Sequence, residues 1–97
     1  MIRILGIDPG SRFIGFGVID FEGSHTKHVA NGCIRVKGET LSEKLHQIFT
    51  KINDAITEYQ PEEVSIEKVF MHKNADSALK LGQARGVAIA ACATREL

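Results

Sequence analysis

The 97-residue sequence predicts an α/β fold, in which one mixed sheet is combined with two helices in the order β-β-β-α-β-α. Three observations lead to this prediction. The first part of the chain alternates short apolar runs with turns that contain glycine or proline, which is typical of consecutive strands. A long segment with apolar residues at helical spacing follows. A fourth apolar run then precedes a segment of helical length that is rich in alanine and glycine.

The first two strands are predicted from apolar runs on either side of a strong turn. Ile2–Ile7 has the composition of a strand that is buried on both faces. The turn Asp8-Pro9-Gly10-Ser11 ends it, because proline presets the turn and glycine accepts positive φ. In the second strand, Phe13–Phe21, Gly15 and Gly17 share one face. Two glycines remove bulk from that face, so we expect a close approach to the backbone there.

A third strand over His28–Lys37 follows the turn Glu22-Gly23-Ser24 and completes an antiparallel meander. Its residues alternate between an apolar and a more polar face, so we expect it to be half exposed. His25 and His28 form an H-x-x-H pattern, which we place in or beside the turn. No third ligand lies in reach, and a metal site there is disfavoured.

The segment Thr40–Gln60 is the clearest helix in the sequence. Thr40 and Glu43 form a capping box at its start, and Pro61 ends it. One apolar stripe runs along it at a spacing of three and four residues. The stripe consists of Leu41, Leu45, Ile48, Phe49, Ile52, Ile56 and Tyr59.

The remaining elements are a fourth strand over Glu63–Val69, a short loop over Phe70–Lys73 and a second helix. Asn74 or Asp76 can cap this helix, which runs to about Glu96. The first helix provides the crossover connection that the fourth strand needs in order to pair in parallel with the first.

The second helix carries Gly82, Gly86 and Ala90 at intervals of four residues. A glycine inside a helix costs roughly 0.5–1 kcal/mol relative to alanine, so two of them require an explanation. Small residues at this spacing allow a close neighbour. Close packing against the sheet and close packing against a second helix, from a partner subunit, both remain open.

Composition and charge exclude several classes of protein. No apolar run approaches the ~18 residues of a membrane span. Cys33 and Cys92 lie far apart and form no CxxC motif, which disfavours a disulfide framework and fits a reduced cytoplasmic setting. The net charge is zero, but residues 1–67 carry seven basic and ten acidic side chains, whereas residues 68–97 carry five and two. A basic face that binds phosphates and a solvated helix face are the two interpretations of this asymmetry.

The candidate chemistry rests on two carboxylates. If the fourth strand pairs in parallel with the first, Asp8 and Glu67 both lie at carboxyl ends of adjacent strands, where sites of open α/β sheets are found. Two carboxylates at one edge can bind one or two Mg²⁺ ions, and a metal pair can support phosphodiester cleavage. The alternative is turn chemistry for Asp8 and solvent exposure for Glu67.

The loop after the fourth strand offers a second candidate site. Phe70 and Met71 either plug the corner between strand and helix or present an aromatic ring to an unpaired base. Lys73 lies beside them and could neutralise a phosphate.

Two segments, GIDPGSRFIGFGVI (Gly6–Ile19) and IEKVFMHKNADSALKLGQARG (Ile66–Gly86), resemble the RuvC family of bacterial Holliday-junction resolvases. The shorter segment NGCIR (Asn31–Arg35) resembles the third strand of that family, and the resemblance covers essentially the whole chain. It implies an RNase H-like fold and a homodimer that nicks four-way DNA junctions symmetrically with Mg²⁺ or Mn²⁺, in DNA recombination and repair in the cytoplasm.

The resemblance also implies roles for individual residues. Asp8 and Glu67 resemble the first and second catalytic, metal-binding carboxylates, and Phe70 resembles an aromatic residue that contacts bases. Arg12 and Lys73 are assigned with it to DNA binding. The helix face with Gly82, Gly86 and Ala90 resembles the dimer contact, and the expected partners are the RuvA and RuvB branch-migration proteins.

The family continues into a fifth strand and carries two further carboxylates near its C-terminus. We therefore expect residues 1–97 to form a partial RNase H-like nuclease domain that is truncated before the fifth strand and does not cut DNA alone. Two competing interpretations remain. GIDPGS followed by GxG also resembles the phosphate loop of actin-like ATPases and sugar kinases, and the chain could be a junction-binding remnant without catalysis.

Overall fold

The first strand of the chain lies inside the sheet and is paired on both sides. The structure, a computed structural model, describes residues 1–67 and 75–97. The strands are β1 (Ile2–Asp8), β2 (Phe13–Glu22), β3 (His25–Arg35) and β4 (Glu63–Ile66), in the spatial order β3-β2-β1-β4. β2 is antiparallel to β1 and β3, whereas β4 is parallel to β1. The predicted mixed sheet and the parallel pairing of the fourth strand with the first are confirmed.

The two helices are α1 (Leu41–Tyr59) and α2 (Ala75–Thr94). The predicted capping box is present, because the Glu43 amide donates to Thr40 Oγ1 over 3.1 Å and the Thr40 amide donates to the Glu43 carboxylate over 3.5 Å. Gln60 adopts the left-handed conformation with φ 48° and ends α1, as expected just before Pro61.

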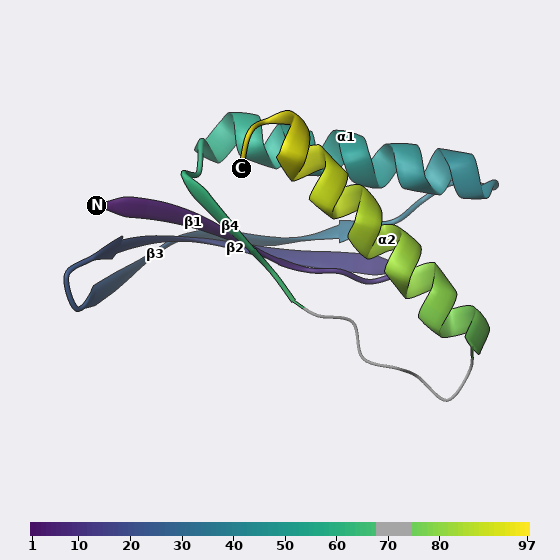
Figure 1. Ribbon diagram of the computed structural model, residues 1–97, viewed down its shortest axis with the longest axis horizontal. Helices are drawn as coiled ribbons and strands as arrows, with labels where there is room; N and C mark the ends of the chain where they lie inside the picture. The colour runs from purple at the N-terminus through teal and green to yellow at the C-terminus, as the bar shows by residue number, and fades with distance from the viewer. Residues whose placement is uncertain (68–74) are drawn as a thin grey trace.

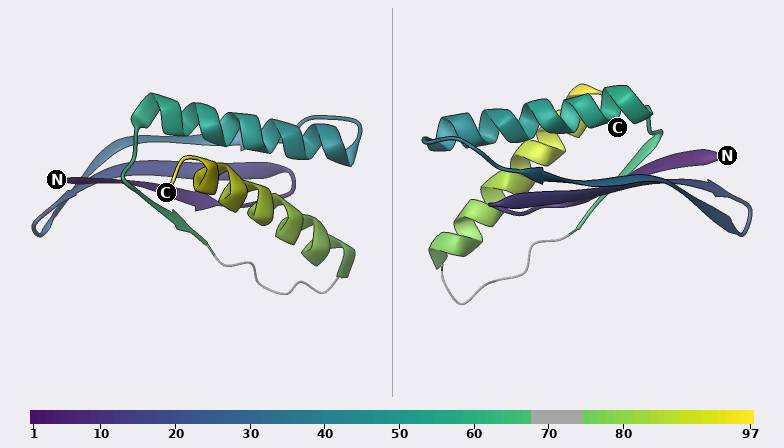
Figure 2. Two further views of the ribbon diagram at one scale, coloured as in Figure 1. Left: turned by 45° about the horizontal axis from the view of Figure 1, so that its top comes forward. Right: turned by 180° about the vertical axis from the view of Figure 1, so that it is seen from behind.

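Alternation along the strands separates a buried face from an uncovered one. Leu5, Ile14 and Val18 are fully buried and pack with Ile48 and Ile52 of α1. α1 lies along one face of the sheet, and α2 crosses diagonally against α1 and beside β4 (Figures 1 and 2). The other face of the sheet carries the alternate residues of the strands. No helix of residues 1–67 and 75–97 covers it, so it is the face on which a site can open.

The predicted bounds of the third and fourth strands differ from the structure, and β3 ends at Arg35 rather than Lys37. β3 begins at His25 rather than His28, because the hairpin turns at Gly23, whose φ of 60° suits glycine. His25 and His28 therefore lie in the strand directly beside the turn, which is one of the two places predicted for them. Val29 is the extra residue of a bulge opposite Val18 and Ile19. β4 ends at Ile66, and the predicted continuation to Val69 lies outside the described residues.

The glycines of α2 do not pack against the sheet, so that explanation of them is wrong. A methyl group built on Gly82 or Gly86 would meet no atom within 4 Å outside the helix's own backbone. The buried side of α2 consists instead of Ala84, Ala88 and Ala91. Alanine at these positions lets α2 approach α1 closely, while the glycines lie on the exposed side.

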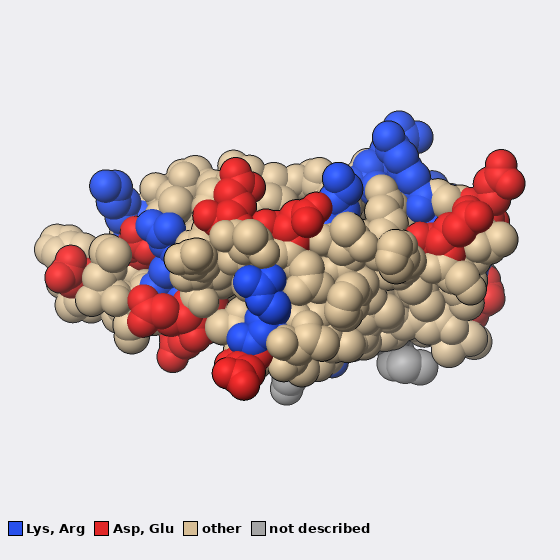
Figure 3. Space-filling model, turned by 90° about the horizontal axis from the view of Figure 1, so that it is seen from above, with Lys and Arg blue, Asp and Glu red and all other residues tan. Residues whose placement is uncertain are grey.

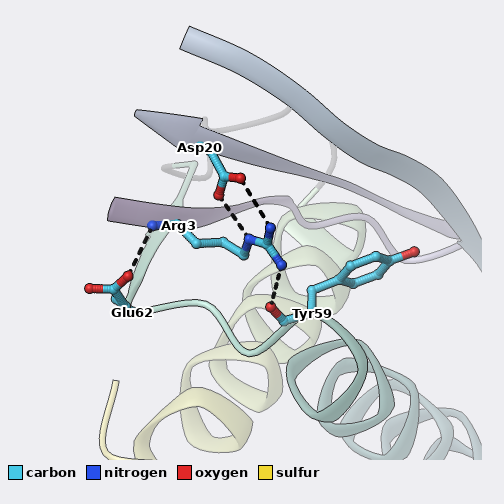
Figure 4. Close-up of polar contacts among 4 residues, drawn as sticks. All are labelled: Arg3, Asp20, Tyr59 and Glu62. Atoms are coloured by element: carbon cyan, nitrogen blue, oxygen red, sulfur yellow. Dashed lines mark hydrogen bonds and ion pairs between the residues drawn. The ribbon is translucent and has the colours of Figure 1, made fainter. Parts of the chain in front are cut away.

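A group of polar contacts at the amino end of β1 joins this strand to β2, to the end of α1 and to Glu62, which precedes β4. The Arg3 guanidinium forms two hydrogen bonds to the Asp20 carboxylate over 2.8 and 3.0 Å, and its third donor contacts the Tyr59 carbonyl at the end of α1 over 3.1 Å (Figure 4). The Arg3 amide donates to the Glu62 side chain over 3.4 Å, and the Glu62 amide donates back to Arg3 over 2.8 Å. These contacts fix the position of the connection between α1 and β4.

Candidate active site

The two candidate carboxylates, Asp8 and Glu67, come directly after a pair of residues in parallel register. Ile7 of β1 lies opposite Ile66 of β4, and the Glu67 amide donates to the Ile7 carbonyl over 3.0 Å. The Ile7 side chain faces the core. Successive side chains along a strand point to opposite faces, so Asp8 and Glu67, which follow Ile7 and Ile66, belong to the uncovered face. The structure thus brings together the two carboxylates that the sequence analysis singled out.

The side chain of Glu67 lies beside that of Asp8. Hydrogen bonding to Asp8, the negative charge of Asp8 and partial desolvation raise the pKa of Glu67 above its usual value. Two adjacent carboxylates that repel each other in the charged form are the donor set that a hard divalent cation prefers. Over residues 1–67 and 75–97, no third histidine, cysteine or carboxylate joins them to make a group of three.

The carboxylates border an open hollow of about 400 Å³ on the uncovered face. Its floor includes Gly6, Gly15 and Gly17, and Ser65 lies at its side. A methyl group on Gly15 would touch only the Asp8 Cβ at 3.7 Å, and one on Gly17 would touch nothing within 4 Å. The predicted bare face of β2 is therefore present, and it opens directly beside the carboxylates.

Gly32 of β3 also lines this hollow, but packing within the fold explains why this residue is a glycine. A methyl group there would lie 2.7 Å from the ring of Phe16. The Phe16 ring packs against the core on the side of the helices. Gly32 is thus required by packing, in contrast to Gly15 and Gly17.

Arg85 is one of the five basic residues of the segment 68–97, and it makes a specific contact at the site. Its Nε donates to the Glu67 carbonyl over 3.0 Å. The other basic residues described in this part of the chain also have contacts. Lys80 pairs with Asp76 over 3.1 Å, and Arg95 donates to Thr57 of α1 over 3.0 Å. No local sequence signal links Arg85 to a residue 18 positions earlier.

Basic and acidic side chains are interspersed on the face seen in Figure 3. Arg12 is exposed in the turn between β1 and β2, where its carbonyl accepts a hydrogen bond from the Val36 amide over 2.8 Å. With Gly10 and Ser77 it lines a second open hollow of about 420 Å³, which lies between the turn and the start of α2. Phe70 and Lys73, the other two residues assigned to DNA binding, lie outside the described residues.

None of the helices in the described ranges is long and apolar enough to cross a membrane.

Comparisons with known proteins agree with this geometry. Residues 4–97 match the family model of crossover junction endodeoxyribonuclease RuvC. Curated proteins of that name from Hahella chejuensis and Psychromonas ingrahamii are 57% and 58% identical over all 97 residues. The chain spans 56% of the length of each of these relatives.

Two solved structures show the same fold. The structure of Thermus thermophilus RuvC with a Holliday junction substrate matches 97% of this chain and 58% of its own, with a TM-score of 0.88 at 24% identity. The Aquifex aeolicus PPX-GPPA enzyme matches 89% of this chain and 33% of its own, with a TM-score of 0.55 at 17% identity. The α/β sheet described above is therefore of the RNase H-like type.

Proposed function

The chain belongs to the RuvC family of crossover junction endodeoxyribonucleases, and from this premise we propose that the protein is a metal-dependent nuclease that resolves four-way DNA junctions by paired symmetric nicks. The proposal includes a role in DNA recombination and repair and a location in the cytoplasm. Residues 1–97 would then form part of an RNase H-like nuclease domain, because the relatives are almost twice as long.

The observation that carries the proposal is the pairing of Asp8 with Glu67. Parallel register between β1 and β4 brings Asp8, the last residue of β1, and Glu67, the residue after β4, to the same edge of the sheet. Asp8 raises the pKa of Glu67, which indicates that the two carboxyl groups lie close together at this edge. Such a site is suited to a cation that in turn contacts a phosphate.

We assign Asp8 and Glu67 to the binding of Mg²⁺, with Mn²⁺ as the alternative ion. When bound between carboxylates, such an ion supplies Lewis-acid stabilisation of the phosphate oxygens and lowers the pKa of a water molecule. The protein's own part is to hold the two carboxylates together. It also keeps the floor beside them, at Gly15 and Gly17, free of side chains so that a DNA strand can come close.

DNA contacts and assembly complete the proposal. We assign Arg12, Phe70 and Lys73 to DNA binding, and Arg12 is exposed at the same end of the sheet as the carboxylates. The exposed side of α2 carries Gly82 and Gly86 beside Ala90, and we assign it to a homodimer contact. RuvA and RuvB are the proposed partners in branch migration.

An actin-like or sugar-kinase-type ATPase is not favoured. The family model covers the whole of the phosphate-loop resemblance and also the segment up to Leu97, which the ATPase interpretation leaves unexplained. The similarity to the Aquifex aeolicus enzyme concerns the fold alone. ATP hydrolysis by the protein would restore this interpretation, and junction binding without cleavage would favour a non-catalytic remnant.

The test is cleavage of a four-way junction by the full-length protein in Mg²⁺, with a duplex of the same sequence as the substrate control. We expect two symmetric nicks with the wild-type protein and none with Asp8→Asn or Glu67→Gln. Both variants should still retard the junction in a gel when Ca²⁺ replaces Mg²⁺. Equal cleavage of junction and duplex, or full activity of either variant, would contradict the proposal.

A further inference from the structure

The peptide at Glu67 is held from two sides. Its amide donates to the Ile7 carbonyl of β1 over 3.0 Å, and its carbonyl accepts from Arg85 Nε of α2 over 3.0 Å. β4 is only four residues long and ends at Ile66, so Glu67 lies just beyond the last residue of the strand. A carboxylate at the end of so short a strand has little regular structure to fix it, and the contact from α2 supplies the missing constraint.

We propose that Arg85 is a positioning residue, which holds the Glu67 backbone so that its carboxylate stays beside Asp8. The expected effect of Arg85 on catalysis rests on the proposed function, whereas its expected effect on the Glu67 peptide does not. Partners that orient a metal-binding side chain without touching the metal commonly change affinity or activity by 10- to 100-fold when they are removed.

The contact indicates that Arg85 acts through the backbone and not through its charge. The bonding atom is Nε, and the acceptor is a main-chain carbonyl rather than the Glu67 carboxylate. The pKa of the Glu67 carboxyl is raised by Asp8 and by desolvation. A neutral side chain with a donor at the same place should therefore serve as well as arginine.

Two substitutions separate the hydrogen bond from the charge. In Arg85→Gln, the amide nitrogen follows Cδ as Nε does in arginine, so a donor remains at the bonding position while the charge is lost. In Arg85→Met, a methyl group takes that position, so size is kept and the donor is lost. Arg95→Gln is the matched control, because it removes an arginine that lies directly after the same helix and bonds to Thr57 of α1.

Three quantities are measured on the full-length protein: kcat, KM for a four-way junction in Mg²⁺, and hydrogen exchange of the Glu67 amide by NMR in the absence of DNA and metal. We expect Arg85→Met to lower kcat about 10- to 100-fold with KM little changed. Loss of one hydrogen bond should speed exchange of the Glu67 amide by about 2- to 12-fold. Arg85→Gln and Arg95→Gln should stay close to wild type in kcat and in exchange of the Glu67 amide.

The outcomes divide clearly. If Gln and Met lower activity equally through KM, while exchange at Glu67 is unchanged, Arg85 contacts a DNA phosphate and the proposal is overturned. Unchanged exchange and unchanged kcat in Arg85→Met would also overturn it. If the wild-type protein cuts no junction but Arg85→Met still speeds exchange at Glu67 and Gln does not, the positioning role stands and the proposed nuclease function fails.

Discussion

The Glu67 amide donates to the Ile7 carbonyl over 3.0 Å at the end of the parallel pair β1 and β4, so Glu67 lies beside Asp8, and Asp8 raises the pKa of Glu67. Repulsion between the two carboxylates therefore disfavours the form of the pair in which both are charged. This repulsion lowers the stability of the metal-free protein and increases the affinity for a divalent cation. Both quantities can be measured without a nuclease assay.

The first prediction concerns pH and metal. A carboxyl whose pKa is raised by folding binds its proton more tightly in the folded state, so stability falls as pH rises from about 4.5, the ordinary value, through the raised pKa. We expect Glu67→Gln to be more stable than wild type at pH 7 without metal and to lose that advantage below pH 4. Urea unfolding at several pH values measures this difference.

Mg²⁺ or Mn²⁺ should reverse the order, because a ligand that binds only the folded state stabilises it. The wild-type midpoint should rise with added cation, and the midpoints of Asp8→Asn and Glu67→Gln should not. Glu63→Gln, which removes an exposed carboxylate from the far end of β4, is the control and should behave as wild type. An equal gain for all four proteins would show that the cation binds elsewhere.

The second prediction compares two glycines that line the same hollow. Gly32→Ala should destabilise the protein by about 1–3 kcal/mol, because its methyl group would lie 2.7 Å from the Phe16 ring. Gly17→Ala should be neutral or stabilising by about 0.5–1 kcal/mol, since nothing lies within 4 Å of the new methyl group. Chemical denaturation of the two variants side by side checks the contrast, and equal effects would contradict it.

The third prediction concerns the start of α1. Thr40→Ala removes the side chain that accepts from the Glu43 amide over 3.1 Å, and it should cost about 1 kcal/mol of stability. Thr50→Ala, in the exposed middle of the same helix, should instead be neutral or slightly stabilising, because alanine has the higher helix propensity. If the two variants lose the same stability, the capping box contributes nothing beyond propensity.

The fourth prediction concerns the ion pair at the other end of β1. Hydrogen bonding to Arg3 lowers the pKa of Asp20, so its contribution to stability is present above the ordinary value of about 3.8 and is lost as pH falls through the lowered pKa. Asp20→Asn should reduce stability at pH 7 and flatten the acid side of the stability curve. Asp54→Asn, on the exposed side of α1, serves as the control.

The sequence predicts most of this fold because each element has its own local signal. The Thr40–Glu43 capping box and the apolar stripe define α1, and only Leu41 of that stripe is largely exposed, at 52%. The start of β3 differs from the prediction because residues 25–27 form no apolar run, and pairing with β2 decides their conformation. Asp8 and Glu67 could be brought together from topology alone, since parallel strands align their carboxyl ends.

The Arg85 contact could not be predicted in that way. It depends on how far α2 crosses the end of β4, and this is set by alanine packing between α2 and α1 rather than by any motif. The same packing decides the place of the glycines on α2. Spacing shows that Gly82 and Gly86 share a side of the helix with Ala90, but only the tertiary arrangement shows that this side is exposed.

The last prediction tests what covers that exposed side. Leu79 is 61% exposed and Ile89 is 40% exposed, and they flank the glycines on the same helix. If a second copy packs there, Gly86→Leu should prevent association without harming the fold, because the glycine has open space around it and leucine is the better helix former. Sedimentation equilibrium of the full-length protein should give a dimer for wild type and a monomer for the variant.

Thr50→Leu places the same side chain on the exposed side of α1 and should leave the dimer intact. The thermal midpoint of monomeric Gly86→Leu should be compared at low concentration with that of wild type, where mass action no longer favours the dimer. A dimer of unchanged affinity in Gly86→Leu would show that subunits meet elsewhere. The exposed glycines of α2 would then have no explanation in assembly, since the chain's own packing does not require them.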